Sequence, residues 1–210
     1  MAMNHIKKLV AISLLSLSSI ASASTFTFSG NFVNQKDVAR VDFSVASNAT
    51  NVRLWTDSFM ANATNPFGTN FDPITALWNT STGALISQND DDNSINPATQ
   101  TGFDSGFSLA TLAAGNYFFT VAAFNNFAAG SNIINGFLFD GLDPIAIGMF
   151  NQPLNGNNAR GSFWRVNLDG VDMATGPVDP NPSAVPLPGA VWLFGTAIAG
   201  FAGFGRRKTV

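Results

Sequence analysis

The chain has 210 residues and no cysteine, so its composition alone excludes disulfide bonds and thiol chemistry. Its single histidine, His5, lies near the amino terminus, which excludes serine–histidine triads and histidine-built metal sites from the rest of the sequence. Residues 24–184 contain five basic side chains against 13 acidic ones, all aspartate, which gives them a net charge of −8. We therefore expect a body that repels nucleic acid and anionic surfaces and attracts divalent cations.

The first residues have the order of a secretory signal peptide. Two lysines precede an apolar run over residues 9–20, and the run ends in Ala21-Ser22-Ala23. Small residues such as Ala21 and Ala23, separated by one position, form the pattern that signal peptidase cleaves. The apolar run is too short for a transmembrane anchor, which needs about 20 residues. We expect residues 1–23 to be a signal peptide and the rest of the chain to be exported across the inner membrane.

Residues 24–173 predict a single all-β domain. Glutamate is absent and lysine is scarce, so the residues that favour exposed helix surfaces are missing. Apolar and polar residues alternate instead, as in Val41, Phe43 and Val45. About eight to ten short strands, separated by turn signals, predict an antiparallel β-sandwich. The clearest expected strands are residues 25–28, 41–45, 51–55, 73–78, 84–87, 103–109, 116–124 and 162–168.

Three of these segments carry a finer prediction. The turn at residues 80–83 should join its two neighbouring strands into a hairpin. Residues 116–124 are apolar on both faces, which is typical of a central strand covered on both sides. Two short apolar segments flank Asn135-Gly136, a sequence that favours a two-residue hairpin.

The chain ends in a spacer and a segment with three parts. Residues 174–184 contain three prolines among small and polar residues, which predicts a semi-rigid linker. A proline-containing motif follows, then an apolar run over residues 190–205 and a basic cluster at residues 206–208. The apolar run is shorter than the ~20 residues of a comfortable membrane-spanning helix, and the basic cluster after it should stay cytoplasmic.

In this order of motif, apolar span and basic end, residues 185–208 resemble the PEP-CTERM sorting signal of Gram-negative bacteria. The motif here is a variant without the glutamate that names the family. The resemblance implies an exosortase, a membrane protease similar to transpeptidases, that recognises the motif and detaches the protein. It also implies a final place at the cell surface or in extracellular polysaccharide. The residues that it assigns to sorting are Val185, Pro186, Leu187, Pro188, Arg206, Arg207 and Lys208.

The body is similar to bacterial pre-peptidase C-terminal domains over roughly residues 53–121. The residues that carry the resemblance are Asp72-Pro73, Thr82-Gly83, Asn89-Asp90-Asp91 and Ala114-Gly115-Asn116-Tyr117, in that order. The resemblance implies a jelly-roll-like, non-catalytic β-sandwich that binds ligands or assists secretion, in some members with calcium. This chain differs in having no peptidase attached, so an assisting role has no obvious object.

The run Asp90-Asp91-Asp92 is the candidate cation site. Crowded carboxylates suit calcium, which takes oxygen ligands. The alternating pattern of an EF-hand loop is absent, however, and a solvated turn has the same composition. If calcium binds, we expect Asp90 and Asp92 to be its ligands and Asp91 to point away.

Three tryptophans are the candidate ligand-binding residues. Trp55, Trp78 and Trp164 could stack on sugar rings if they faced solvent, although a tryptophan on a strand more commonly packs in the core. A pair of aspartates could in principle cleave a glycoside, but no spacing singles out a pair.

The sequence therefore predicts an exported, non-enzymatic surface or matrix protein associated with exopolysaccharide and biofilm. Its partners would be signal peptidase, an exosortase-like protease and exopolysaccharide, with no nucleic acid, and its carboxyl-terminal segment would contact the membrane before processing. Two alternatives stay open. The chain could be a calcium-assisted carbohydrate-binding or adhesin module, or a periplasmic protein left anchored in the inner membrane.

Overall fold

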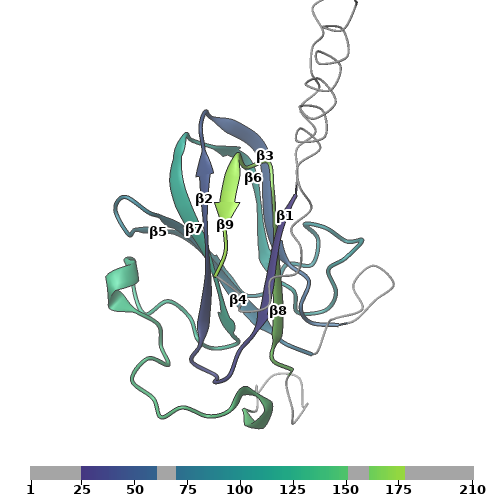
Figure 1. Cartoon of the computed structure of the whole chain (residues 1–210), viewed down its shortest axis with the longest axis vertical. Coiled ribbons are helices and arrows are strands. Elements are labelled where there is room, and N and C mark those ends of the chain that lie inside the picture. The colour runs from purple at the N-terminus through teal and green to yellow at the C-terminus, as the bar shows by residue number, and fades with distance from the viewer. Residues whose placement is uncertain (1–24, 61–69, 151–160, 178–210) are drawn as a thin grey trace, which may run out of the picture.

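The structure, a computed structural model, describes residues 25–60, 70–150 and 161–177. Within these ranges the chain forms nine strands and two short 3-10 turns, and no α-helix (Figure 1). None of the described segments is a helix long and apolar enough to cross a membrane. The expected signal peptide and the expected transmembrane segment at residues 190–205 lie outside the described residues. The strands are β1 Phe26–Asn31, β2 Val38–Val45, β3 Ala49–Thr56, β4 Pro73–Asn79, β5 Leu85–Asn89, β6 Gly106–Leu112, β7 Gly115–Ala123, β8 Phe163–Asp169 and β9 Met173–Thr175.

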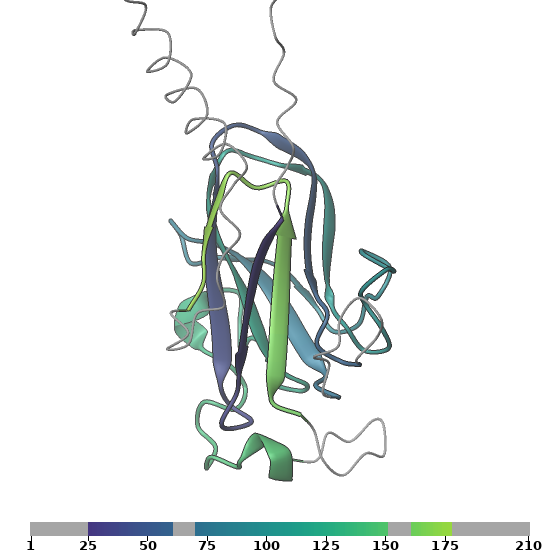
Figure 2. The ribbon, with the colours of Figure 1, turned by 45° about the vertical axis from the view of Figure 1, so that its right-hand side comes forward.

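The strands form two antiparallel sheets, as the sequence predicts. One sheet has four strands in the order β1-β8-β3-β6, and the other has five in the order β5-β4-β7-β2-β9. Figure 2 shows the two sheets facing each other. Strands β1 and β8 of the four-stranded sheet lie at the front of the view, and β2 lies beside β9 in the five-stranded sheet. The expected hairpin between β4 and β5 is present, because Thr75 pairs with Asn89 and Leu77 with Ser87.

The core lies between the sheets and follows from the period-two alternation of strands. In β2, the buried residues Val41, Phe43 and Val45 alternate with more exposed neighbours. They face apolar side chains of the other sheet, including Leu54 and Val166, which are fully buried. Burial of each such side chain stabilises the fold by roughly 1.5–3 kcal/mol.

Strand β7 is covered on both faces, which confirms the prediction for a central strand. Its residue Phe119 points into the main core, whereas Phe118 points to the outer face of the five-stranded sheet. There Phe118 stacks on Trp78, with ring centroids 5.8 Å apart. The cover comes from residues 124–150, here called the strap, through the partly buried side chains of Ile133 and Phe137.

The prediction of a two-residue hairpin at Asn135-Gly136 is wrong. Residues 133–135 instead form the 3-10 turn η1 (Ile133–Asn135), and Gly136 ends it with a φ of 70°. The side chain of Asn132 accepts a hydrogen bond from the backbone N–H of Ile134 at 3.1 Å, and the side chain of Asn135 accepts one from that of Asn132 at 3.3 Å. Asparagine side chains therefore satisfy the backbone groups that a β-ladder would have used.

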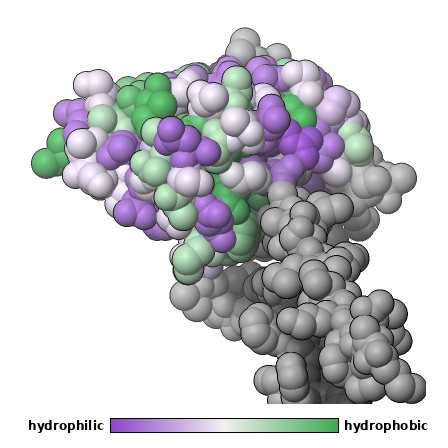
Figure 3. Space-filling view, turned by 90° about the horizontal axis from the view of Figure 1, so that it is seen from above, coloured by the Kyte–Doolittle hydropathy of each residue, from purple (hydrophilic) through white to green (hydrophobic). Residues whose placement is uncertain are grey.

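The buried side chain of Gln35 helps to fix the strap to the turn between β1 and β2, beside backbone hydrogen bonds between the same segments. The Nε2 of Gln35 donates to the carbonyl of Asp143 at 2.8 Å, and its Oε1 accepts from the backbone N–H of Ile145 at 2.6 Å. The second 3-10 turn, η2 (Ile147–Met149), follows. Seen from above, the described surface mixes hydrophilic and hydrophobic residues (Figure 3).

The end of the domain differs from the expected boundary. Strand β9 begins at Met173, the last residue assigned to the domain, and takes Ala174 and Thr175 from the expected linker. Its short pairing with β2 holds the chain on the sheet immediately before the remaining residues of the linker.

Candidate functional site

An acidic group forms where β4 begins and β5 ends. Because these strands are antiparallel neighbours, Asp72 before β4 lies close to Asp90 and Asp91 after β5. Each of the three aspartates offers one carboxylate oxygen, and these oxygens all lie within 4.8 Å of one another. Asp72 is buried, Asp90 is partly buried and Asp91 is exposed, so the group reaches from the interior to the surface.

The spacing of these oxygens suits a calcium ion. Calcium–oxygen distances are 2.3–2.6 Å, so two ligands on opposite sides of one ion are about 4.8 Å apart. Three carboxylates can supply up to six oxygens, and calcium takes six to eight. The donor set therefore fits a calcium ion, with solvent able to complete the shell on the side of Asp91.

The environment of the group raises the pKa of two of its carboxyls, those of Asp90 and Asp91. Burial raises the pKa of Asp90 to about 6, and the charge of Asp91 adds to this rise. Burial also raises the pKa of Asp91. The Oδ1 atom of Asp90 is buried and accepts no hydrogen bond from the described residues. A cation would favour the charged forms of both side chains.

The composition of the group differs from the expected pair. Asp90 belongs to the group, but its neighbours there are Asp72 and Asp91, whereas the sequence paired it with Asp92 and expected Asp91 to point away. The Oδ1 of Asp92 accepts hydrogen bonds from the backbone N–H and the hydroxyl of Ser94, at 2.9 and 2.5 Å, and so closes a turn. The sequence signal for Asp72 was its position directly before β4, next to the end of the returning strand.

Buried hydrogen bonds hold the loop between β5 and β6, residues 90–105, which contains Asp90 and Asp91. The hydroxyl of Ser105 lies 2.8 Å from that of Thr75 in β4 and donates to the carbonyl of Asn89 in β5 at 3.2 Å. The side chain of Gln100 donates to the carbonyl of Asp92 at 2.9 Å. These bonds tie the loop to both strands that supply the acidic group.

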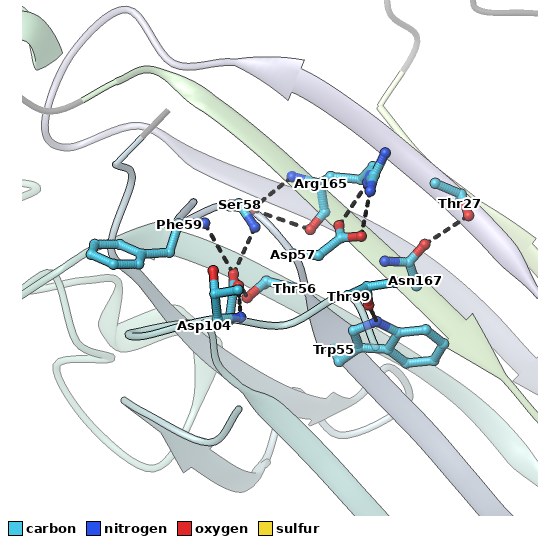
Figure 4. A network of polar contacts seen from close by, with 11 residues as sticks. Thr27, Trp55, Thr56, Asp57, Ser58, Phe59, Thr99, Asp104, Arg165 and Asn167 are labelled. Atoms are coloured by element: carbon cyan, nitrogen blue, oxygen red, sulfur yellow. Dashed lines mark hydrogen bonds and ion pairs between the residues drawn. The ribbon is translucent and has the colours of Figure 1, made fainter. Parts of the chain in front are cut away.

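A second buried carboxylate, Asp104, has a structural role (Figure 4). It accepts hydrogen bonds from the backbone N–H groups of Ser58 at 2.6 Å and Thr101 at 2.9 Å. Burial raises its pKa to about 6, against the effect of these bonds. Its two oxygens are engaged by three backbone N–H groups and by the hydroxyl of Thr56, so the carboxylate joins separate parts of the chain.

The buried ion pair of Asp57 and Arg165 is also structural. The Nε and Nη2 atoms of Arg165 donate to the two oxygens of Asp57 at 2.7 and 2.5 Å (Figure 4). Burial raises the pKa of Asp57, and the Arg165 guanidinium opposes that rise. The pair joins the end of β3 to β8, and such bidentate geometry fixes orientation.

The three candidate tryptophans are buried. Trp55, Trp78 and Trp164 expose 3%, 0% and 5% of their surface. The ring nitrogens of Trp55 and Trp78 donate to Thr99 and Thr120, and Trp164 stacks on Phe32. Their rings are therefore not open to a sugar, and the alternative of core packing is confirmed.

The candidate processing residues lie outside the described residues. They are Ala21, Ala23, Val185, Pro186, Leu187, Pro188, Arg206, Arg207 and Lys208. Their roles stay predictions from the sequence. No protein-family model matches the chain, and no curated protein matches it either.

Proposed function

We propose that this chain is an exported, non-enzymatic β-sandwich protein of the cell surface or extracellular matrix, sorted and processed by an exosortase-type system. The order of its segments supports this proposal: a signal-like start, an all-β body, a proline-containing spacer and a motif–span–basic tail. Association with exopolysaccharide follows from the resemblance of residues 185–208 to PEP-CTERM signals.

The bonds made by two buried carboxylates support the proposal that the protein is not an enzyme. Asp57 engages an arginine and Asp104 engages backbone donors, so neither carboxylate is left to act as an acid, base or nucleophile. Histidine and cysteine are absent from residues 24–184. The fold therefore supports a role in binding or structure rather than in a reaction.

Mass spectrometry of the protein from culture supernatant and from membranes tests the placement. We expect the secreted form to begin near Ser24 and to lack the apolar run at residues 190–205. A secreted form that keeps residues 192–208, or a protein confined to the inner membrane, would contradict sorting and favour the anchored periplasmic alternative.

A matched pair of variants tests the motif itself. Replacing Pro186 and Pro188 by alanine should leave the tail attached, because these residues form the motif assigned to the protease. Replacing Pro180 and Pro182 by alanine changes the spacer by the same chemistry and should leave processing intact. Equal processing of both variants would show that the motif is not read.

A second candidate function, a calcium-assisted binding module, is favoured by the group of Asp72, Asp90 and Asp91. Extracellular calcium sites bind with dissociation constants of about 0.1–1 mM. Calcium at ten times such a constant should stabilise the fold by about 1.4 kcal/mol. Calorimetric titration without heat, together with an unchanged melting temperature in calcium, would remove this candidate.

A further inference from the structure

A shallow cleft lies on the outer face of the five-stranded sheet, away from the acidic group. Its volume is about 270 Å³, and it crosses β2, β7 and β9. Phe43 and Tyr117 pair across β2 and β7 and belong to the core, so the neighbouring residues of each strand face outward. The outward side chains that line the cleft are Asp42, Ser44, Thr80, Asn116, Met173 and Thr175.

The strand register brings these side chains together. Ser44 lies opposite Asn116 on one side and opposite Met173 on the other, and Asp42 lies opposite Thr175. Hydroxyl, amide and carboxylate groups thus lie beside the apolar side chain of Met173. That side chain is 69% exposed, so a ligand can reach it. Small-ligand sites combine apolar walls with a few polar groups that fix orientation.

The carboxylate in the cleft is held in place before any ligand arrives. Arg40 donates from Nε to both oxygens of Asp42, at 3.1 and 3.0 Å, and from Nη2 to Oδ1 at 2.5 Å. The Arg40 guanidinium itself lies 3.8 Å above the ring of Phe118. Because a carboxylate has about four acceptor positions, a ligand hydroxyl can still donate to Asp42. A preorganised acceptor binds at a lower entropic cost.

The chemistry of a sugar residue matches this lining. Its hydroxyls can donate to a carboxylate and exchange hydrogen bonds with serine, threonine and asparagine, and its C–H face can lie against a methionine. The volume is just below the range of about 300–1,000 Å³ for sites of drug-sized ligands, so one sugar residue fits and a longer chain would leave through the open side.

Charge narrows the class of sugar. The carboxylate of Asp42 is paired with Arg40, so the repulsion of uronic-acid and sulfated polymers comes from the body as a whole, since residues 24–184 carry a net charge of −8. We infer that the cleft of Asp42, Ser44, Asn116 and Met173 binds one neutral or amino-sugar residue of an extracellular polysaccharide. This inference rests on the proposed placement at the cell surface or in the matrix.

Titration of the purified mature protein with defined sugars tests the inference. The probes are a chitin oligosaccharide as neutral sugar, a chitosan oligosaccharide as amino sugar and an alginate oligosaccharide as polyuronate, each followed by calorimetry. We expect the chitin or the chitosan probe to bind and the alginate probe not to bind. Binding of alginate as tight as that of the other two, or no binding of any probe, would overturn the inference.

Variants locate the binding on the molecule. Ser44→Ala combined with Asn116→Ala should weaken binding at least about tenfold, because two ligand hydrogen bonds are lost. Met173→Ala, a change at an exposed side chain, is the second variant and should weaken binding without affecting the core. Ser108→Ala is the matched control, since Ser108 is exposed on β6 of the other sheet. Unchanged affinity in both cleft variants would also overturn the inference.

The outcome is separable from that of the proposed function. A mature protein without its tail that binds none of the probes leaves the placement standing and overturns the cleft. A protein that keeps its tail and still binds a probe through Ser44 and Asn116 overturns the proposed placement and leaves the cleft standing as a sugar site.

Discussion

Asp104 accepts a hydrogen bond from the backbone N–H of Ser58 at 2.6 Å, although 46 positions separate the two residues. The same oxygen accepts bonds from the N–H of Phe59 at 3.2 Å and the hydroxyl of Thr56 at 3.1 Å. The other oxygen accepts from the N–H of Thr101. One carboxylate therefore holds the chain after β3 against the chain before β6, where no strand ladder does so.

The variant Asp104→Asn tests this role. Its amide NH2 would face backbone donors, and each buried donor without a partner costs about 1–3 kcal/mol. We expect the free energy of unfolding in urea to fall by about 2–4 kcal/mol. The control is Asp140→Asn, because Asp140 is exposed and accepts one backbone bond, from Phe137. Its loss should stay below about 1 kcal/mol, and equal losses in the two variants would contradict the role of Asp104.

Stability should depend on pH in an unusual direction. Burial raises the pKa values of Asp104 and Asp90 from 3.8 to about 6. A carboxyl with a raised pKa binds its proton more tightly in the folded state, so its contribution is complete below about pH 3.8 and is lost as the pH rises through 6. We expect the free energy of unfolding to fall between about pH 4 and pH 7 in a calcium-free buffer. Urea unfolding across this range measures it, and a steady rise would contradict it.

Calcium should reverse part of this fall if the acidic group binds it, because the ion favours charged carboxylates. Asp90→Asn should abolish the calcium-dependent rise in melting temperature. Asp92→Asn should keep that rise, because Asp92 binds Ser94 and does not belong to the group. Loss of the rise in both variants would instead restore the pair of Asp90 and Asp92 expected from the sequence. Thermal unfolding with and without a chelator measures both variants.

The positions of most strands could be predicted from the sequence, because alternation is a property of neighbouring residues. Because β7 is apolar on both faces, its central position in the five-stranded sheet could also be predicted. The start of β6 could not be predicted: the expected strand began at residue 103, whereas β6 begins at Gly106 because Asp104 binds backbone groups far away in the chain.

The candidate site could be predicted only in part. The acidic run pointed to Asp90, but the contribution of Asp72 depends on the pairing of β4 with β5, and the run alone does not reveal which carboxylates meet. The outer-face cleft depends on the register of three strands that are all far apart in sequence, and β9 is too short to leave a periodic signal.

Strand β6 approaches the backbone of β3 closely at Gly106, and this contact gives a further prediction. A Cβ atom on Gly106 would lie 2.7 Å from the Cα of Trp55 and even closer to the carbonyl oxygen of Leu54, and its φ of 155° is unfavourable for other residues. Gly106→Ala should therefore lower the free energy of unfolding by about 2–4 kcal/mol, since the backbone of β3 has to move. Gly141→Ala is the matched control, because no heavy atom lies within 4 Å of its added Cβ. Its effect should stay within about 0.5 kcal/mol. If Gly106→Ala unfolds in urea at the same midpoint as Gly141→Ala, the two strands do not approach as closely as the structure shows.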